Sequence, residues 1–375
     1  MDLLAGVWNY AIPFLGILTV VVFFHEMGHY LIARWNGVRI EVFSIGFGPA
    51  LYSWDDRAGT RWKLSLIPLG GYVKMFGDSN VTSTPDGKSR PLTPEEQKIS
   101  FLHKRLSQRT AIVFAGPLAN FLLAILLFAG LFSVVGQPFS VPVVSEVEEG
   151  SAAAAGGLQP GDRILSMNGQ GIERFEDIQR IVQLGLGEPL MIVVDRNGAE
   201  VTLSATPKVI EQTDSFGNIF QVGRLGIRSS GFDYVRHGPL TAIWRGAEAT
   251  VNFTGVTLKA LGQMIAGTRT MKDLGGPLRI AELSGQVAEG GIDSIVFFMA
   301  VLSINLGLIN LFPIPVLDGG HLLFYAIEAI RGKPLGERAQ EYGFRIGLAL
   351  VLVLILFVTW NDLVHLGVVG LLGAG

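Results

Sequence analysis

Four apolar runs constrain this chain more than any other feature of its sequence. They lie near residues 11–33, 111–135, 295–312 and 346–360. Each run approaches the roughly 20 residues that a helix needs to cross the hydrocarbon core of a bilayer. Composition agrees, because only 16% of the residues are charged, against about 25% in an ordinary soluble domain. The sequence therefore predicts an α-helical membrane protein with about four transmembrane helices.

A long insert of mixed composition separates the second apolar run from the third. Short β-type runs alternate with Gly-rich turns from residue 137 to residue 230, and one helical pattern covers about 175–184. This alternation predicts a small inserted α+β domain over 137–230. The remaining organisation is then an N-terminal membrane half over 1–136 and a C-terminal membrane half over 295–375.

A connector over residues 231–294 joins the inserted domain to the third apolar run. Its apolar residues are scattered among Arg245, Glu248 and Lys259, which makes it too polar for a clear span. We expect one or two amphipathic helices that lie at the membrane surface. A fifth crossing within residues 239–266 is the alternative.

Two alternating runs follow the first span and predict a β-hairpin. They cover residues 39–47 and 61–66, and the polar segment 55–59 lies between them. Because the strands are rich in Phe, Trp and Ile, we expect the hairpin to be membrane-associated, with the 61–66 run nearest the first span. A hairpin on the protein surface is the alternative. The Ser-, Thr-, Pro-, Asp- and Lys-rich residues 77–98 predict a loop.

Basic residues predict the orientation of the chain in the membrane. Residues 34–109 contain twelve Lys and Arg residues, and residues 331–345 contain four. Since basic loops stay on the cytoplasmic side, both segments should be cytoplasmic. The inserted domain is then on the other side, which is the periplasm if the chain is a multi-pass protein of a bacterial inner membrane.

Charge and cysteine content exclude other partners and ligands. The net charge of −3 argues against a nucleic-acid partner, because a phosphate-binding surface needs a basic excess. The chain has no cysteine, so any metal site must use nitrogen and oxygen ligands.

The motif His25-Glu26-Met27-Gly28-His29 ends the first apolar run and matches H-E-x-x-H. On a helix, positions i and i+4 lie one turn apart on the same face, so both imidazoles can reach one zinc ion while Glu26 lies beside its open position as general base. Ionisable groups are costly in an apolar span and are functional by default. A hydrogen-bonded structural His pair is the alternative.

Asp318 is the candidate third ligand, because a hydrolytic zinc site usually has three protein ligands and one open position. It follows Pro313 and Pro315 in the third apolar region. These prolines break the helix, and the freed backbone groups must line protein or water. If the first and third spans run in parallel, His25 and Asp318 can meet in the inner half of the membrane. His321 is the competing ligand.

Three segments resemble the site-2 protease family of intramembrane zinc metalloproteases, and within it the branch of bacterial regulator-of-sigma-E proteases. They are the His25–His29 motif, the Asn310–Gly320 run NLFPIPVLDGG and the Gly116–Phe121 segment GPLANF. The inserted domain resembles a PDZ domain, with characteristic turns at 157–162 and 223–227. Known members of this branch have two tandem PDZ domains, whereas the insert has room for one.

The resemblance implies a zinc-dependent endopeptidase with Glu26 as catalytic residue. It also implies His25, His29 and Asp318 as zinc ligands, and substrate binding by Asn305 and Asn310. Hydrogen bonding between helices is the alternative role for the two asparagines. The implied substrates are single-span membrane proteins, such as pre-cleaved anti-sigma factors, or remnant signal peptides in the lipid bilayer.

Two other classes of function compete with a protease. A catalytically inactive, membrane-anchored PDZ scaffold would need neither Glu26 nor three metal ligands. A zinc-dependent transporter would distribute acidic and His residues along a path through several spans. Here such residues cluster at two places, and the second run has no charge between Ala111 and Val135. The pattern therefore favours the protease.

Overall fold

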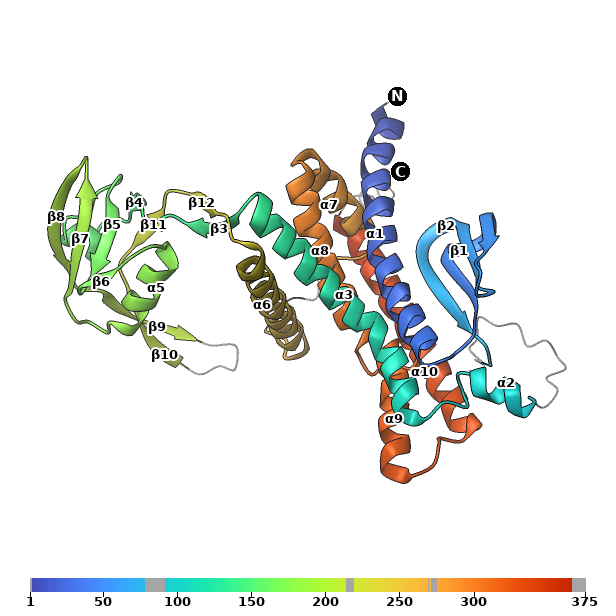
Figure 1. The fold of residues 1–375 in the computed structure, drawn as a ribbon. Coiled ribbons are helices and arrows are strands. Elements are labelled where there is room, and N and C mark those ends of the chain that lie inside the picture. The colour runs from blue at the N-terminus through green and yellow to red at the C-terminus, as the bar shows by residue number, and fades with distance from the viewer. Residues whose placement is uncertain (1, 78–91, 214–218, 269, 271–274, 366–375) are drawn as a thin grey trace, which may run out of the picture. The chain divides into compact units, whose positions relative to one another are not determined.

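The computed structural model describes residues 2–77, 92–213, 219–268, 270 and 275–365. The chain divides into two compact units (Figure 1). One consists of residues 1–131 and 240–375, and the other of residues 132–239. Each unit is described by itself.

Four helices of the described chain are long and apolar enough to span a membrane, which confirms the predicted number. They cover Trp8–Trp35 in α1 (Asp2–Trp35), Leu106–Val134 (α3), Ile292–Asn310 (α8) and Arg338–Val364 in α10 (Glu337–His365). Helices α1 and α3 pack closely, because a Cβ atom added to Gly28 would lie 2.2 Å from the carbonyl oxygen of Ala115. Small residues thus let the two backbones approach.

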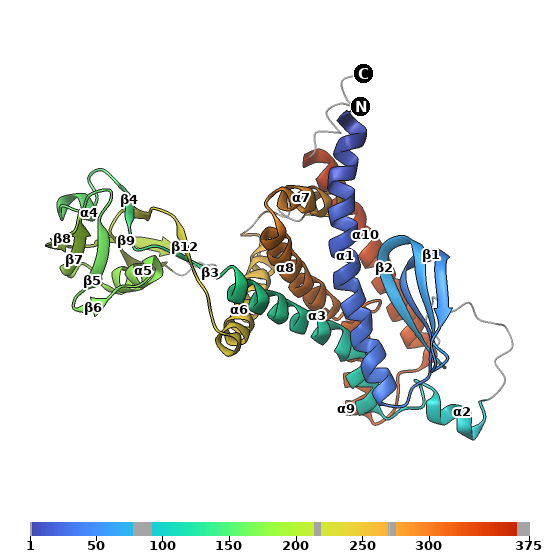
Figure 2. The same ribbon diagram turned by 45° about the horizontal axis from the view of Figure 1, so that its top comes forward.

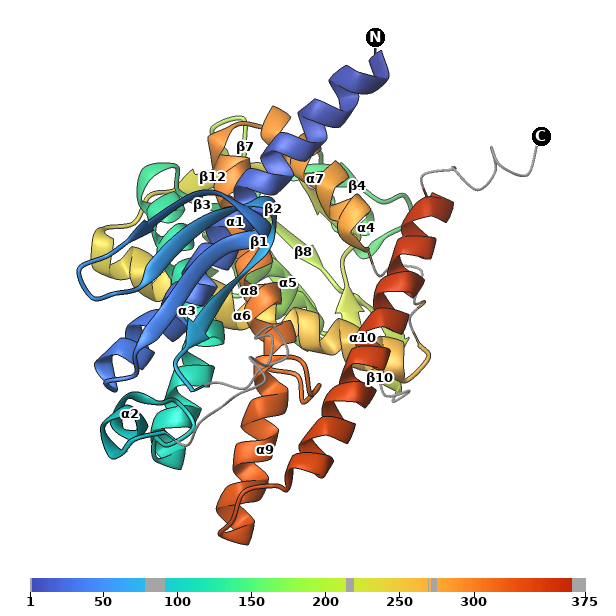
Figure 3. The ribbon, with the colours of Figure 1, turned by 90° about the vertical axis from the view of Figure 1, so that its right-hand side faces the viewer.

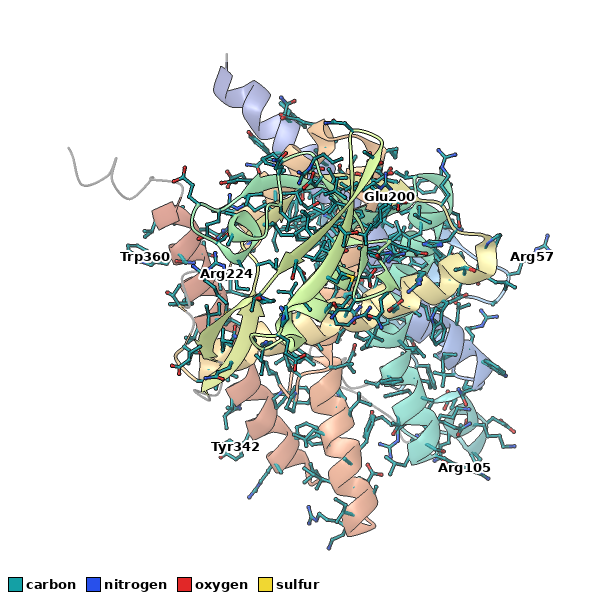
Figure 4. All side chains as sticks on the ribbon, turned by 90° about the vertical axis from the view of Figure 1, so that its left-hand side faces the viewer. Arg57, Arg105, Glu200, Arg224, Tyr342 and Trp360 are labelled. Atoms are coloured by element: carbon teal, nitrogen blue, oxygen red, sulfur yellow. The ribbon has the colours of Figure 1, made fainter. Side chains whose placement is uncertain are left out.

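Aromatic residues mark both ends of α10. The side chains of Tyr342 and Trp360 are exposed and project away from the helix (Figure 4). At about 1.5 Å per residue they lie about 27 Å apart along the helix axis, close to the roughly 30 Å of a hydrocarbon core. Since Trp and Tyr are enriched at membrane interfaces, their spacing supports α10 as a span.

The connector forms two helices, α6 (Pro239–Ile265) and α7 (Pro277–Glu289). Helix α6 is 27 residues long, but it is not apolar enough to be among the four candidate spans. The Phe253 ring lies 5.7 Å from the rings of both Phe128 on α3 and Phe297 on α8. A Cβ atom on Gly246 would lie 2.7 Å from the carbonyl oxygen of Ile125. Helix α6 therefore packs directly against two of the candidate spans.

Strands β1 (Ile40–Asp55) and β2 (Arg61–Met75) form the predicted antiparallel hairpin, which lies beside α1 (Figure 2). Both strands bend, so the sheet curls back on itself (Figure 3). Residues 42–45 of β1 pair with 71–74 of β2 on one side and with 61–64 on the other. Residues 61–64 are therefore inside the sheet, and residues 71–75 form one of its edges.

The expectation that the 61–66 run lies nearest the first span holds only in part. The Trp62 ring lies 5.4 Å from that of Tyr30 on α1, but another part of β2 lies beside the His25–His29 motif. Residues 71–75 line the cavity beside His25 and Glu26. Glycines at the bends explain the difference, because Gly46 and Gly70 have φ angles of 87° and 131°, which residues with a side chain rarely adopt. The bends return β2 to α1, and this long-range course has no local signal in the sequence.

The predicted loop over residues 77–98 is also corrected in part. Residues 78–91 lie outside the described residues, but α2 (Pro94–Ile99) forms in the remainder. Its first turn is a capping box, in which the backbone N–H of Thr93 donates to Glu96 Oε2 at 2.8 Å and the N–H of Glu96 donates to Thr93 Oγ1 at 3.3 Å. The T-x-x-E pattern of residues 93–96 could have predicted the start of this helix from the sequence.

The second unit is an α+β fold around one hydrophobic core. Its largest sheet has the strand order β6-β5-β7-β8. Alternate residues of the central strands face inward, and Ile164, Ile192 and Val194 are fully buried. Helix α5 covers the predicted residues and adds Ile178 and Val182 to the core. The elements are β3 (Gln137–Ser140), β4 (Val144–Val147), α4 (Ala152–Ala155), β5 (Arg163–Met167), β6 (Gln170–Gly171), α5 (Phe175–Leu184), β7 (Leu190–Arg196), β8 (Ala199–Ala205), β9 (Lys208–Thr213), β10 (Ile219–Arg224), β11 (Ile227–Ser229) and β12 (Phe232–Val235).

A buried ion pair fastens the start of β5 to the end of β7. Asp162 is 1% exposed and accepts hydrogen bonds from Nε and Nη2 of Arg196, both at 2.7 Å. The backbone N–H of Gln159 donates to Asp162 Oδ2 at 2.8 Å. Burial alone would raise the pKa of Asp162, but the hydrogen bonds and the charge of Arg196 lower this pKa below its ordinary value.

Candidate active site

Three potential metal ligands converge in the unit formed by residues 1–131 and 240–375, which contains the candidate spans and is called the membrane unit below. Asp318 Oδ2 lies 3.2 Å from Nε2 of His25 and 3.4 Å from Nε2 of His29. The two imidazole Nε2 atoms are 3.3 Å apart. All three ligand atoms lie within 4.8 Å of one another, so one ion can contact them together.

Local structure explains how Asp318 reaches the two histidines. Helix α8 ends at Asn310, and α9 (Asp318–Arg331) begins at Asp318 itself. The proline-containing segment between them is not helical, as the sequence predicted. Asp318 therefore lies in the first turn of α9, where the helix dipole favours a carboxylate. A Cβ atom on Gly319 would lie 2.2 Å from the carbonyl oxygen of Phe312, so glycine permits this tight return of the chain.

Helix α3 forms the back of the site. A Cβ atom on Gly116 would lie 2.3 Å from Nε2 of His29, so a larger residue would displace this imidazole. Nδ1 of His29 lies 2.9 Å from the carbonyl oxygen of Ile112. A carbonyl oxygen only accepts hydrogen bonds, so this nitrogen carries the proton and donates. Nδ1 of His25 lies 3.1 Å from the side-chain amide of Asn120.

Glu26 borders a cavity of about 210 Å³ in the membrane unit. Residues 71–75 of β2 form one wall, and a Cβ atom on Gly71 would lie 3.0 Å from Cγ of Glu26. At about 30 Å³ per water molecule in the liquid, the cavity has room for several waters. The carboxylate of Glu26 is therefore beside space that a nucleophilic water and part of a substrate can occupy.

The ligand set fits a zinc ion. Two imidazole nitrogens and one carboxylate oxygen are a common ligand set of catalytic zinc. Asp318 Oδ2 is buried, and no hydrogen bond of acceptable geometry with a described residue satisfies it. Its imidazole neighbours at 3.2 and 3.4 Å present nitrogens that can also bind a cation. A cation between the three atoms would satisfy this otherwise costly buried oxygen.

The other predicted site residues lie in different surroundings. Asn310 lines the cavity. Oδ1 of Asn305 instead accepts a hydrogen bond of 3.2 Å from the Thr257 hydroxyl on α6, which favours a role between helices. His321 also lines the cavity, but it is not among the three convergent ligands, and its ring lies 5.4 Å from that of Phe344. The geometry therefore favours Asp318 over His321 as third ligand.

Sequence reasoning assigned no role to Gly71, Gly116 and Asn120, which all contact the proposed catalytic helix. A signal for Asn120 existed, because a carboxamide in an otherwise uncharged span is costly unless it has a partner. Gly116 also lies in the GPLANF segment that carries the family resemblance, but that segment did not show its role. Gly71 had no local signal, since its importance depends on which helix lies opposite.

Comparison with known proteins shows the family of this chain. The model of Peptidase family M50 matches residues 13–354. This chain belongs to Peptidase family M50. A protein of Rhizobium meliloti named "Putative zinc metalloprotease" is 47% identical over 369 residues, which are 97% of this chain and 99% of that protein. "Metalloprotease MmpA" of Caulobacter vibrioides is 39% identical over 376 residues and covers 94% of each chain.

The M50 chain is therefore a zinc metalloprotease and a membrane protein, and its predicted resemblance to site-2 proteases is confirmed. The solved PDZ domain of an SdrC-like protein from Listeria innocua covers 25% of this chain and 98% of its own, with 21% identity and a TM-score of 0.20.

Proposed function

We propose that this M50 protein is an intramembrane endopeptidase that cuts single-span membrane proteins, with His25, His29 and Asp318 as zinc ligands and Glu26 as catalytic residue. One observation carries the proposal, namely the convergence of two Nε2 atoms and Asp318 Oδ2 beside the cavity that Glu26 borders.

The chemistry follows from the residues around this cavity. Zinc, when bound, supplies a Lewis acid that polarises the scissile carbonyl and makes water more acidic. Glu26 accepts a proton from the attacking water and transfers it to the leaving nitrogen. Helix α3 fixes the imidazoles from behind, through the Ile112 carbonyl and the Asn120 amide. Both ligands are thus oriented before substrate arrives.

A transmembrane substrate must unwind before it is cut, because a helix uses its carbonyls in intrahelical hydrogen bonds. Residues 71–75 of β2 pair with β1 on one side, and the structure describes no strand paired to their other side. An unwound segment can add to this edge as a further strand. Asn310, which lines the same cavity, can hydrogen-bond the substrate backbone. The hairpin would then lie within the membrane.

The proposed orientation puts residues 34–109 in the cytoplasm and the PDZ-like domain, residues 137–230, in the periplasm of a bacterial inner membrane. The basic loops and the meeting of His25 with Asp318 support it. Pre-cleaved anti-sigma factors or remnant signal peptides would be suitable substrates, because both are single spans that an earlier cut has already trimmed outside the membrane.

The test is cleavage of a single-span substrate by the purified full-length protein in lipid vesicles. We expect one zinc per chain and product masses that locate the cut within the apolar span. Cuts confined to the soluble flanks of the substrate would contradict intramembrane proteolysis, even if zinc is present.

A further inference from the structure

Asn120 is a buried polar residue in the middle of α3, and its side chain contacts a proposed zinc ligand. Its side-chain Nδ2 lies 3.1 Å from Nδ1 of His25. The residue is fully buried. The Ser303 hydroxyl on α8 donates to the backbone carbonyl of Asn120 at 2.8 Å, and this bond fixes the position of the residue between two candidate spans.

The zinc-binding role of His25 determines which hydrogen bond it can make. Its Nε2 faces Asp318 and the Nε2 of His29, so this nitrogen needs a free lone pair to bind a metal. A neutral imidazole carries one proton, which must then be on Nδ1. Nδ1 is therefore a donor and needs an acceptor. His29 shows the same arrangement, because its Nδ1 donates to the carbonyl oxygen of Ile112.

The amide of Asn120 can supply this acceptor if Oδ1 rather than Nδ2 faces His25. The two amide orientations have nearly the same shape, and the hydrogen-bond network decides between them. With Nδ2 toward His25, two donors would face each other and Oδ1 would be buried without a hydrogen-bond partner among the described residues. Rotation of the Asn120 amide would therefore break no hydrogen bond, and it would let Oδ1 accept one from Nδ1–H of His25.

We propose that Asn120 is the positioning residue of His25, with Oδ1 accepting the hydrogen bond from Nδ1–H and so holding the tautomer whose Nε2 binds zinc. The inference rests on the proposed function, because it assumes that His25 is a zinc ligand. Helix α3 would then orient both histidines of the motif, one through a backbone carbonyl and the other through a side-chain oxygen.

The test compares zinc affinity of the full-length protein with two changes at this position. Asn120→Asp keeps an acceptor oxygen of the same reach but cannot donate, and Asn120→Ala has neither group. In competition with a chelator of known affinity, we expect Asn120→Ala to bind zinc about 10–100-fold more weakly and Asn120→Asp to stay within about threefold of the original protein. Equal weakening by both changes would overturn the proposal, because it would show that the amide is needed as a donor or as packing.

A matched control separates this role from helix packing. Ser303→Ala removes the hydrogen bond to the backbone of Asn120 and leaves its amide in place. We expect this variant to lose thermal stability but to keep its zinc affinity. A loss of zinc as large as that of Asn120→Ala would overturn the proposal in favour of packing.

A second measurement is made on the original protein, and a variant serves only to assign the signal. In the zinc-free original protein with ¹⁵N-labelled histidine, we expect the signal of His25, assigned by its disappearance in His25→Gln, to show a protonated Nδ1. An Nδ1 without a proton would overturn the proposal, because it could not donate to Oδ1 of Asn120. His25→Ala tests the underlying function separately: if that variant keeps its zinc, the proposed ligand set fails. If it loses zinc while Asn120→Ala keeps it, only the role of Asn120 fails.

Discussion

Nε2 of His25 lies 3.2 Å from Oδ2 of Asp318, although the two residues come from the first and the second membrane half of the chain. Helix α1 provides the imidazole and the first turn of α9 provides the carboxylate. The contact brings together the H-E-x-x-H motif and the proline-broken segment of the third apolar region. The proposed catalytic site thus depends on the assembly of both halves.

Asp318→Asn should weaken zinc binding and abolish cleavage, because the carboxamide has no charge and is a poorer ligand than a carboxylate. His321→Gln should keep its zinc, since His321 lies outside the convergent set. Metal analysis after dialysis against a chelator, together with a cleavage assay, distinguishes the two. Zinc retained in Asp318→Asn and lost in His321→Gln would make His321 the third ligand.

Cross-linking tests the edge of β2 that we propose binds substrate. The chain has no native cysteine, so single cysteines can be introduced cleanly. With Tyr72→Cys in an inactive background, we expect disulfide cross-links to cysteines near the cleavage site of a substrate. Tyr52→Cys is the control, because Tyr52 is exposed on the half of β1 that pairs with residues 61–65. Equal cross-linking at both positions would argue against capture at the 71–75 edge.

Cysteine labelling tests the orientation of the membrane unit and of the inserted domain. Lys333→Cys should react with a membrane-impermeant reagent only from the cytoplasmic side. Glu200→Cys, on the exposed part of β8 (Figure 4), should react only from the opposite side. Labelling of both cysteines from one side would contradict the proposed arrangement of spans.

Asp162 should make the stability of the second unit depend on pH. Its pKa in the folded state is lowered, so its stabilising contribution is fully present above the unfolded pKa of about 3.9 and is lost as pH falls through the folded pKa. At pH 7, Asp162→Asn should destabilise the unit by about 2 kcal/mol, because hydrogen bonds to a charged group are lost.

Amide hydrogen exchange of β5 and β7 in the full chain measures this effect. After correction for the intrinsic pH dependence of exchange, the difference between the original protein and Asp162→Asn should shrink at pH values below about 3.9. A difference that stays constant as pH falls would show that the charge of Asp162 does not stabilise the unit.

Periodicity and local motifs predicted the spans, the hairpin, α5 and the ligand candidates, because apolar length, alternation and i, i+4 spacing are properties of short segments. Asp318 could be predicted as a ligand because Pro313 and Pro315 break a helix in an apolar region. The 71–75 edge was missed because it depends on how Gly46 and Gly70 bend paired strands. The contact between Asn120 and His25 was missed because it depends on which face of α3 meets α1.

The most direct measurement is the cleavage rate and the zinc content of Glu26→Gln. Glutamine has nearly the same size and leaves His25, His29 and Asp318 unchanged, but it cannot accept the proton of the attacking water. General-base catalysis is typically worth about 10²–10⁴ in rate, and Glu26 also transfers the proton to the leaving nitrogen, so we expect a loss of about 10⁴-fold or more. The variant should retain one zinc per chain and still bind substrate. Near-normal cleavage by this variant would remove Glu26 from the mechanism and contradict the proposed active site.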